Sequence, residues 1–281
     1  GYGLGPMEER AALMTEFLTL FLILLAPAVG SFLAVLVDRL PQQEDVIAKA
    51  SACRSCTTRL RARDLVPLLS YLGLRGRCRH CGAAIPAWLF YMEILALGAA
   101  VLALAAGGSL AEVLLSCLFL WLLLALAMAD LLWFRLPDLL TVAVFAAGLA
   151  LAVLTSPAAG PEGLGFALLG AGLGAGSFLA LRTGYRGLRG REGLGLGDVK
   201  LMAGLGAFAG PLDLPLLVLL AALLALAGGI WQHLRSPVSP PVQTSPASDE
   251  VSSGPLALMA LPFGTALCAA AALIWVLRAG H

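Results

Sequence analysis

Long apolar stretches alternate with short polar segments along almost the whole chain. A helix needs about 20 mostly apolar residues to cross the hydrocarbon core of a membrane. The candidate spans cover residues 17–37, 87–107, 110–129, 138–154, 163–182, 198–211, 213–234 and 255–278. The pattern predicts an all-α protein, a polytopic bundle of about eight membrane helices.

The sixth candidate span, 198–211, is short and rich in glycine. Small residues let helix backbones approach closely inside a membrane bundle. We therefore expect this segment to be a tilted or half-buried helix that packs within the bundle.

Composition supports the membrane assignment. Of the 281 residues, 60% are hydrophobic and only 12% are charged, whereas a soluble domain carries about 25% charged residues. The mean hydropathy is +0.92. The net charge of +1 gives no indication of a nucleic-acid partner, and we expect none.

Basic residues are distributed unevenly between the polar segments. Segment 38–86 carries half of the 18 Lys and Arg residues, so the positive-inside rule places it in the cytoplasm. Threading the eight spans from there puts all but Arg10 and Arg278 on the same side. Both termini are then expected to face away from the cytoplasm.

These observations predict a division of the chain into four parts. Residues 1–6 precede Met7, and we interpret 1–16 as an expression remnant followed by an N-terminal tail. Segment 17–37 is too long for a cleaved signal sequence and is predicted to be a retained first span. A cytoplasmic loop, 38–86, and a membrane bundle, 87–281, follow. Within the bundle, the Ser- and Pro-rich segment 236–254 is predicted to be a disordered cytoplasmic loop.

The cytoplasmic loop contains two CxxC pairs, Cys53 with Cys56 and Cys78 with Cys81. Two such pairs are typical of a zinc ribbon, in which four thiolates complete a tetrahedron. Disulfides or free thiols are the alternative, but a reducing cytoplasm argues against disulfides. We expect a structural Zn²⁺ that holds a loop with too few apolar residues for its own core.

Four carboxylates lie within or at the ends of the candidate spans: Glu93, Asp130, Asp138 and Asp198. Ionisable groups at membrane depth are candidates for function. The predicted topology places the three aspartates near the cytoplasmic ends of spans and Glu93 about two turns in from the same side. Asp138 follows Pro137 at the start of a span, so helix capping is favoured for it.

The surroundings of the other acids are more informative. Gly193, Gly195 and Gly197 precede Asp198, and their missing side chains make room for an extended chain beside the carboxylate. Asp130 ends the third span, where a negative charge opposes the helix dipole. An ion pair with Arg135 is the structural explanation for Asp130.

Two aspartates on one side of a bundle suggest an aspartyl protease, in which two carboxylates share one proton and activate a water. An ion-coupled transporter that uses the same carboxylates is the main alternative. A scaffold protein whose zinc loop docks a partner is a second alternative. Glu93 has a structural explanation as well, since it could simply fasten helices together.

Several segments together resemble one known family, the type IV prepilin peptidases, which are GxGD-type membrane aspartyl proteases. The match runs through GSFLAVLVDRLP (30–41), ARDLVPLLSYLGLRGRCRHC (62–81), YMEILALGA (91–99), DLLWFRLPDLLT (130–141), GLGLGDVKLMAGLGAFAG (193–210) and PFGTAL (262–267). These segments occur in the family's order and cover nearly the whole chain.

The resemblance implies an activity and assigns residues to it. The family cuts the basic leader from prepilins and pseudopilins after a glycine and methylates the new N-terminus with S-adenosylmethionine. By resemblance Asp130 and Asp198 are the catalytic pair, and Asp138 is a neighbouring acid without a catalytic role. The expected location is the bacterial inner membrane, with the active site on the cytoplasmic side. The remaining assigned residues are Gly195, Gly197, Lys200 and Glu93 for a substrate channel and Gly30 for the methyl donor.

Overall fold

The computed structural model describes residues 6–46, 50–156, 161–190, 194–235 and 262–280. Residues 1–5 of the predicted remnant and the whole predicted loop 236–254 lie outside these ranges. The helices are α1 (Pro6–Arg39), α2 (Leu69–Gly73), α3 (Ala87–Ala106), α4 (Leu110–Trp133), α5 (Asp138–Thr155), α6 (Pro161–Arg189), α7 (Leu196–Arg235) and α8 (Phe263–Ala279), with two short 3-10 helices, η1 (Leu40–Gln42) and η2 (Ala62–Asp64).

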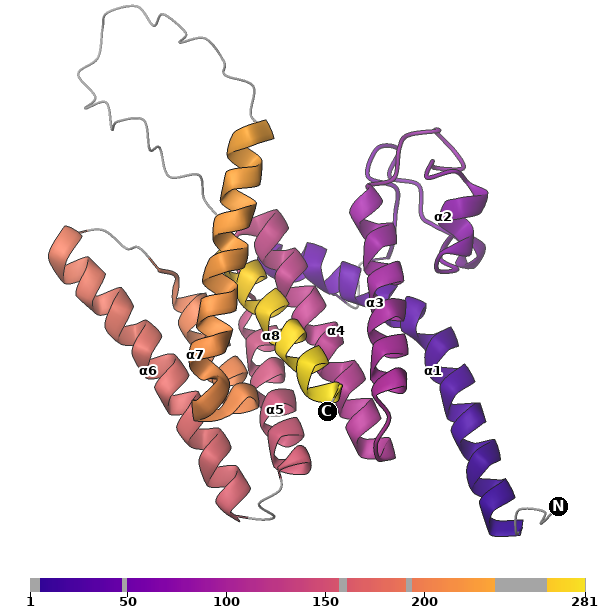
Figure 1. Ribbon diagram of the computed structural model, residues 1–281. Coiled ribbons are helices and arrows are strands. Elements are labelled where there is room, and N and C mark those ends of the chain that lie inside the picture. The colour runs from indigo at the N-terminus through magenta and orange to yellow at the C-terminus, as the bar shows by residue number, and fades with distance from the viewer. Residues whose placement is uncertain (1–5, 47–49, 157–160, 191–193, 236–261, 281) are drawn as a thin grey trace, which may run out of the picture.

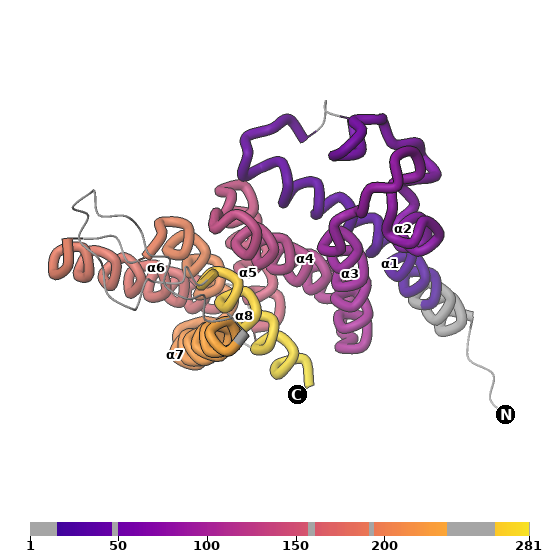
Figure 2. The backbone as a smooth tube through the Cα atoms, turned by 90° about the horizontal axis from the view of Figure 1, so that it is seen from above, coloured from indigo at the N-terminus to yellow at the C-terminus, as the bar shows by residue number. Residues whose placement is uncertain are grey.

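The described residues form an α-helical bundle with a small loop region at one end (Figure 1). In the part of the chain that the structure describes, extended pairing is limited to two isolated bridges, Ala52 with Arg59 and Arg77 with Ala84. Helix α4 is central, since it contacts α1 and α3 on one side and α5 and α8 on the other (Figure 2). The all-α prediction is confirmed.

The number of long apolar helices is lower than the predicted eight spans when α7 is counted as one helix. Among the described residues, six helices are long and apolar enough to cross a membrane, and α8 is a shorter apolar helix. The predicted spans 198–211 and 213–234 both belong to α7. However, α7 consists of two helices joined at the non-helical residue Gly210, so its two legs correspond to these two predicted spans, and the apolar helices of the described residues follow the predicted segments.

Helix α7 reverses direction at Gly210. This residue has φ 69° and ψ 172°, values that a helix does not contain, and Pro211 follows it. Arg278 at the end of α8 holds the reversal: its guanidinium donates to the carbonyl oxygens of Phe208 at 2.8 Å and Ala209 at 2.6 Å. The same guanidinium pairs with Asp213 just beyond the turn, at 2.6 Å. Residues 196–209 are thus a short leg and 211–235 a long leg that returns.

The short leg packs inside the bundle because glycines allow its backbone to touch its neighbours. A Cβ on Gly206 would collide with the carbonyl oxygen of Gly170 in α6, and a Cβ on Gly204 would lie 2.9 Å from the backbone nitrogen of Phe145 in α5. Real Cβ atoms essentially never come this close to a backbone atom. The prediction that the glycine-rich sixth segment packs within the bundle is confirmed.

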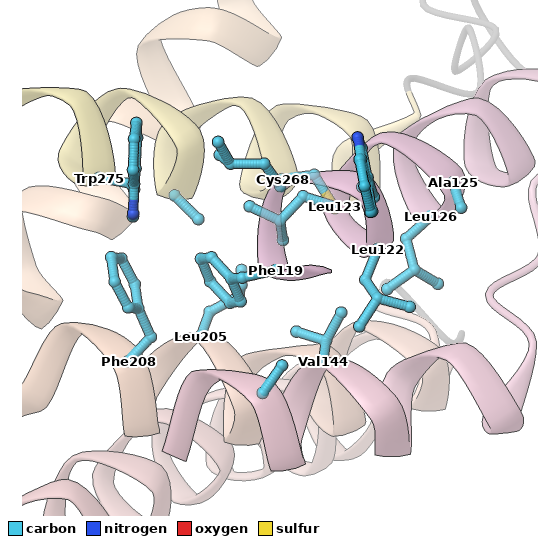
Figure 3. Packing of buried hydrophobic residues seen from close by; sticks show 14 of the residues in the cluster. Phe119, Leu122, Leu123, Ala125, Leu126, Val144, Leu205, Phe208, Cys268 and Trp275 are labelled. Atoms are coloured by element: carbon cyan, nitrogen blue, oxygen red, sulfur yellow. The ribbon is translucent and has the colours of Figure 1, made fainter. Parts of the chain in front are cut away.

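A common apolar core joins α4, α5, the short leg of α7 and α8 (Figure 3). The rings of Phe119 and Phe208 lie 4.6 Å apart between centroids, and Leu126 and Leu205 are fully buried. The indole N–H of Trp275 needs a partner at this depth, and its neighbours supply one through Ser116 Oγ at 3.2 Å. This core holds the helix ends that carry the aspartates.

Candidate active site and metal centre

Asp130 lies in the last turn of α4, where the first turn of α8 approaches it. Its side chain is buried, with the residue 6% exposed. Oδ2 accepts a hydrogen bond from the backbone N–H of Thr265 at 2.7 Å, and the Thr265 hydroxyl lies 3.2 Å away. Because α8 begins at Phe263, these donors belong to a helix N-terminus, which favours a negative charge.

This contact corrects the structural explanation considered for Asp130. The Asp130 carboxylate lies at the C-terminus of α4, where the helix dipole disfavours a negative charge. It also lies at the N-terminus of α8, where the dipole favours one. Arg135 instead donates to the carbonyl oxygen of Pro41 at 3.4 Å, and no ion pair joins Arg135 to Asp130 within the described ranges. Thr265 was missed because its partner is 135 positions away in the chain, although PFGTAL was among the matching segments.

Gly264 explains why α8 can approach the aspartate so closely. A Cβ at this position would lie 3.0 Å from both Cγ and Oδ2 of Asp130 and 3.2 Å from Cδ1 of Leu136. These distances are tighter than nine in ten real Cβ contacts. A larger residue would therefore displace either Asp130 or Leu136.

Asp198 lies in the first turn of α7 and is half-buried. Its carboxylate accepts a hydrogen bond from the backbone N–H of Gly195, as in the half of a capping box that reaches back to the helix start. A Cβ on Gly195 would lie 3.3 Å from Asp198 Oδ2. The glycine therefore allows the carboxylate to fold back over the start of the helix.

Leu136 connects the two aspartate segments. A Cβ on Gly197 would lie 3.1 Å from Leu136 Cβ, and the same leucine borders Gly264 on the other side. The space expected beside Gly197 for an extended chain is therefore filled by Leu136 in this structure. Leu136 is a residue that the sequence reasoning missed, since nothing in the motif distinguishes it from other leucines.

The structure brings Asp130 and Asp198 together at one end of the bundle. Their carboxylates are near enough to interact electrostatically. Both also lie near enough to the buried thiol of Cys268 in α8 to interact with it electrostatically. Two carboxylates at this range, each held by backbone donors, can share a proton and polarise a water between them. The arrangement is suited to general acid–base hydrolysis.

Asp138 and Lys200 form an ion pair at the same end. Lys200 Nζ lies 2.7 Å from Asp138 Oδ1, and both side chains are exposed, at 50% and 71%. The capping role predicted for Asp138 is wrong: α5 is preceded by Pro137, and no side chain caps it. The pair instead ties the start of α5 to the first turn of α7, two residues beyond Asp198.

Glu93 and Gly30 lie elsewhere, where α1 crosses α3. Glu93 accepts hydrogen bonds from the backbone N–H of Leu68, at 2.7 Å, and from the Ser31 side chain. A Cβ on Gly30 would lie 2.6 Å from the carbonyl oxygen of Met92, so close helix packing explains this glycine. Neither Asp130 nor Asp198 lines the cavity of about 280 Å³ beside Glu93. Their association with Glu93 in one substrate channel stays a prediction.

The four loop cysteines converge as the spacing predicted. Their sulfur atoms all lie within 4.8 Å of one another. Cys53 Sγ is 3.8 Å from Cys81 Sγ, and Cys56 Sγ is 4.0 Å from Cys78 Sγ. A tetrahedral site with Zn–S bonds of about 2.3 Å has sulfur–sulfur edges of about 3.8 Å. The donor set and its spacing therefore fit a metal ion such as zinc.

The two halves of the cysteine site have the same local geometry. The N–H of Thr57 donates to the carbonyl oxygen of Cys53 at 2.9 Å, and Gly82 donates to Cys78 at the same distance. Both donors adopt left-handed backbone angles, with φ of 55° and 72°. Each turn thereby points two thiols toward the common centre.

Hydrogen bonds prepare these thiols for metal binding. Bonds from Thr58 lower the pKa of Cys56 to about 6. The backbone N–H groups of Cys81 and His80 lower the pKa of Cys78 as well. Because the thiolate is the form that binds metal, these bonds favour the ligating state of Cys56 and Cys78, whereas burial and the neighbouring thiols raise the pKa of Cys81 to about 11.

Further contacts lie within the loop and between the loop and α3. The Arg79 Nε atom lies 2.8 Å from Asp64 Oδ1, and this hydrogen bond lowers the pKa of Asp64. The Tyr71 ring stacks on Phe90 of α3, with centroids 4.6 Å apart. The loop is thereby fixed beside the start of α3 (Figure 1).

Two family models match the chain. The model described as the bacterial peptidase A24 N-terminal domain covers residues 24–106, and the type IV leader peptidase family covers residues 117–230. The first range contains the cysteine loop and the second contains both aspartates. No solved structure matches the chain.

Curated proteins from several bacteria are also similar. The prepilin leader peptidase/N-methyltransferase of Burkholderia pseudomallei strain 1026b is 36% identical over 255 residues, which are 80% of this chain and 80% of that protein. The protein of the same name from Aeromonas salmonicida strain A449 is 36% identical over 231 residues, 72% and 77% of the two chains. The Dickeya chrysanthemi protein of that name is 35% identical over 241 residues, 77% and 83%.

Proposed function

The chain belongs to the type IV leader peptidase family, and from this premise we propose that Asp130 and Asp198 carry out its hydrolytic reaction. It is a multi-pass membrane enzyme that removes leader peptides from prepilins and methylates the new N-terminus. The observation that carries the catalytic assignment is the approach of the two carboxylates from α4 and α7 at one end of the bundle.

The two aspartates divide the acid and base roles. The backbone N–H groups of Thr265 and Gly264 donate to the Asp130 carboxylate and favour its ionised form, which takes a proton from a water. Asp198 donates its proton to the carbonyl oxygen of the scissile peptide as the water oxygen attacks the carbon. The carbon–nitrogen bond then breaks, and the leaving amine takes up a proton from the pair. The products are the free leader and a mature N-terminus.

Leu136 has a defined part in this proposal. It fills the space between Gly197 and Gly264 that an extended substrate would use. We assign it the role of a side chain that moves aside when the substrate backbone enters. Gly195, Gly197 and Lys200 then border the bound chain, as predicted for the substrate channel.

The cysteine loop is assigned a structural role. Four thiolates close a tetrahedral site and leave no position for a substrate, so a bound Zn²⁺ stabilises the loop and does not take part in hydrolysis. The domain division at residues 38–86 and 87–281 is proposed on the same basis. We also place the loop and the aspartates on the cytoplasmic side of a bacterial inner membrane, because the predicted topology puts nearly all basic residues on that side.

One experiment tests the proposed function as a whole. Purified full-length protein is incubated with a prepilin and labelled S-adenosylmethionine, the donor that supplies the methyl group, and leader loss and methyl transfer are read separately by mass spectrometry. We expect leader loss first and methyl transfer to the new N-terminus second. Ion flux in liposomes without any cleavage would instead support the transporter alternative.

A further inference from the structure

A cavity of about 280 Å³ lies beneath the cysteine loop, between α1 and α3. Its volume is close to the lower end of the range for small-molecule sites, roughly 300–1,000 Å³. The cavity lies at the same end of the bundle as the aspartates, since Arg135, five residues beyond Asp130, donates to the carbonyl oxygen of Pro41 at the end of α1. A larger cavity of about 540 Å³, bordered by Arg278 and Trp275, lies at the opposite end.

The charged residues that line this cavity are Asp38, Arg39, Arg54, Asp64, Arg79 and Glu93. Arg39 donates to the carbonyl oxygens of Asp45 and Val46. Asp38 pairs with Arg54 at 2.9 Å, and Asp64 pairs with Arg79 at 2.8 Å. Glu93 accepts hydrogen bonds only from neutral donors, and no Lys or Arg within the described ranges forms an ion pair with it. A half-buried carboxylate with an open cavity beside it is suited to a cationic ligand.

Aromatic groups and cations complete the lining. Tyr71 and Phe90 both border the cavity, and their stacked rings are nearly parallel, at 13°. Flat heterocycles bind well against such surfaces. Arg54 also lines the cavity, and its guanidinium carbon lies 5.8 Å from the centre of the Trp88 ring. The cavity thus offers an anionic group, an aromatic wall and guanidinium groups within one small volume.

We propose that this cavity is the binding site for S-adenosylmethionine and that Glu93 is the residue that holds its positive sulfonium. The inference rests on the proposed function, because it places the methyl donor of that activity. S-adenosylmethionine combines a cationic sulfur, an adenine ring and a carboxylate, which correspond to Glu93, the Tyr71–Phe90 wall and the arginines. Gly30 contributes by allowing α1 to approach α3, which brings Ser31 to Glu93.

Binding of labelled S-adenosylmethionine to purified full-length protein, measured by equilibrium dialysis, tests the site without relying on activity. Glu93→Gln keeps an acceptor for the Leu68 N–H but removes the charge, and we expect it to raise the Kd about tenfold. S-adenosylhomocysteine carries a neutral sulfur, so its Kd should change less than twofold. The circular dichroism spectrum and the thermal midpoint of the variant should match those of the wild type, which shows that the variant is folded.

Glu112→Gln is the matched control. Glu112 also accepts a hydrogen bond from a backbone N–H, that of Ser109 at 2.6 Å, but it lies at the opposite end of α4. The Kd of the Glu112→Gln variant for S-adenosylmethionine should equal that of the wild type. A second variant, Tyr71→Leu, should raise the Kd values for S-adenosylmethionine and S-adenosylhomocysteine by the same factor, because both ligands carry adenine.

Three results would overturn the inference. Wild-type affinity in Glu93→Gln, together with normal methylation, would place the donor elsewhere and leave the proposed function intact. Equal loss of affinity for both ligands in Glu93→Gln would show that the charge of Glu93 is not what the sulfonium contacts. Displacement of the labelled donor by a basic leader peptide alone, in wild type but not in Glu93→Gln, would assign Glu93 to leader recognition. Absence of methylation in the wild type would count against the proposed function itself.

Discussion

The cysteine loop and the aspartate site are built in opposite ways. In the loop, spacing along the chain places the ligands: each CxxC turn directs two thiols inward, and two like turns face each other. In the aspartate site, residues from α4, α7 and α8 meet because apolar and glycine packing positions whole helices. Changes to the loop should therefore act on metal content, whereas changes to helix packing should act on cleavage.

Removing one thiolate gives the largest expected change. Cys53→Ser leaves three sulfur ligands, and we expect the zinc content of the purified protein to fall from about one ion per chain to near zero. Metal analysis by mass spectrometry measures this directly. Cleavage should persist, because neither aspartate contacts the loop cysteines. Cys117→Ser, within α4 and away from the loop, is the control and should keep its zinc.

A well-folded wild-type sample that contains no metal would contradict the zinc assignment. Loss of cleavage to the same extent as in an aspartate variant would show that the two regions are not separable. Either result would remove the basis for contrasting them.

Filling the space at Gly197 is the corresponding change in the bundle. Gly197→Leu places its side chain against Leu136, only 3.1 Å from the position of the new Cβ. We expect kcat/KM for prepilin cleavage to fall about 100-fold, as for catalytic groups displaced by about 1 Å. The double variant with Leu136→Ala should recover part of the rate. No recovery would show that Leu136 is not the group displaced.

The hydroxyl of Thr265 has a smaller effect. Thr265→Val keeps the backbone N–H that donates to Asp130 but removes the hydroxyl 3.2 Å from Oδ2. The hydroxyl has one proton and also reaches the carbonyl oxygen of Ala127 at 2.9 Å, so loss of its share in the hydrogen bond to Asp130 predicts a decrease in kcat of at most about tenfold. Thr265→Ser retains the hydroxyl and should keep the wild-type rate. An unchanged kcat in the valine variant would limit the role of Thr265 to its backbone.

These contacts show where sequence reasoning is sufficient and where it is not. The CxxC spacing determines which atoms meet, so all four metal ligands were predicted. The glycine-rich short leg was also predicted, because small residues have few uses at membrane depth except close packing. The hydrophobic pattern predicted the two apolar segments 198–211 and 213–234, but it could not show that a single non-helical residue, Gly210, joins the two helices.

The partners of the aspartates were beyond sequence reasoning for a different reason. Thr265 reaches Asp130 only because α8 begins beside the end of α4. Leu136 contacts both Gly197 and Gly264 only because the α4–α5 loop folds between α7 and α8. The cap assigned to Asp138 was wrong because the local pattern at Pro137 could not reveal Lys200, 62 positions later. Long-range packing decides which local possibility is realised.

The ion pair between Asp138 and Lys200 has the smallest expected effect. Both side chains are exposed, and such pairs contribute about 0.2–1 kcal/mol. Asp138→Asn should therefore lower kcat/KM by only about twofold at low salt, with the difference vanishing at high salt. The salt dependence of initial cleavage rates checks this. A loss as large as in the catalytic variants would require Asp138 to be added to the catalytic residues.

The central claim is that Asp130 and Asp198 together hydrolyse the leader peptide. Its most direct test is the single-turnover cleavage rate of a prepilin by Asp130→Asn, Asp198→Asn and the double variant, with Glu162→Gln in the first turn of α6 as a control. We expect each single change to lower the rate by about 10²–10⁴-fold, and the double variant to be no slower than the worse single one, because the pair acts as a unit. Wild-type rates in either single variant, with the protein folded and in the membrane, would contradict the account.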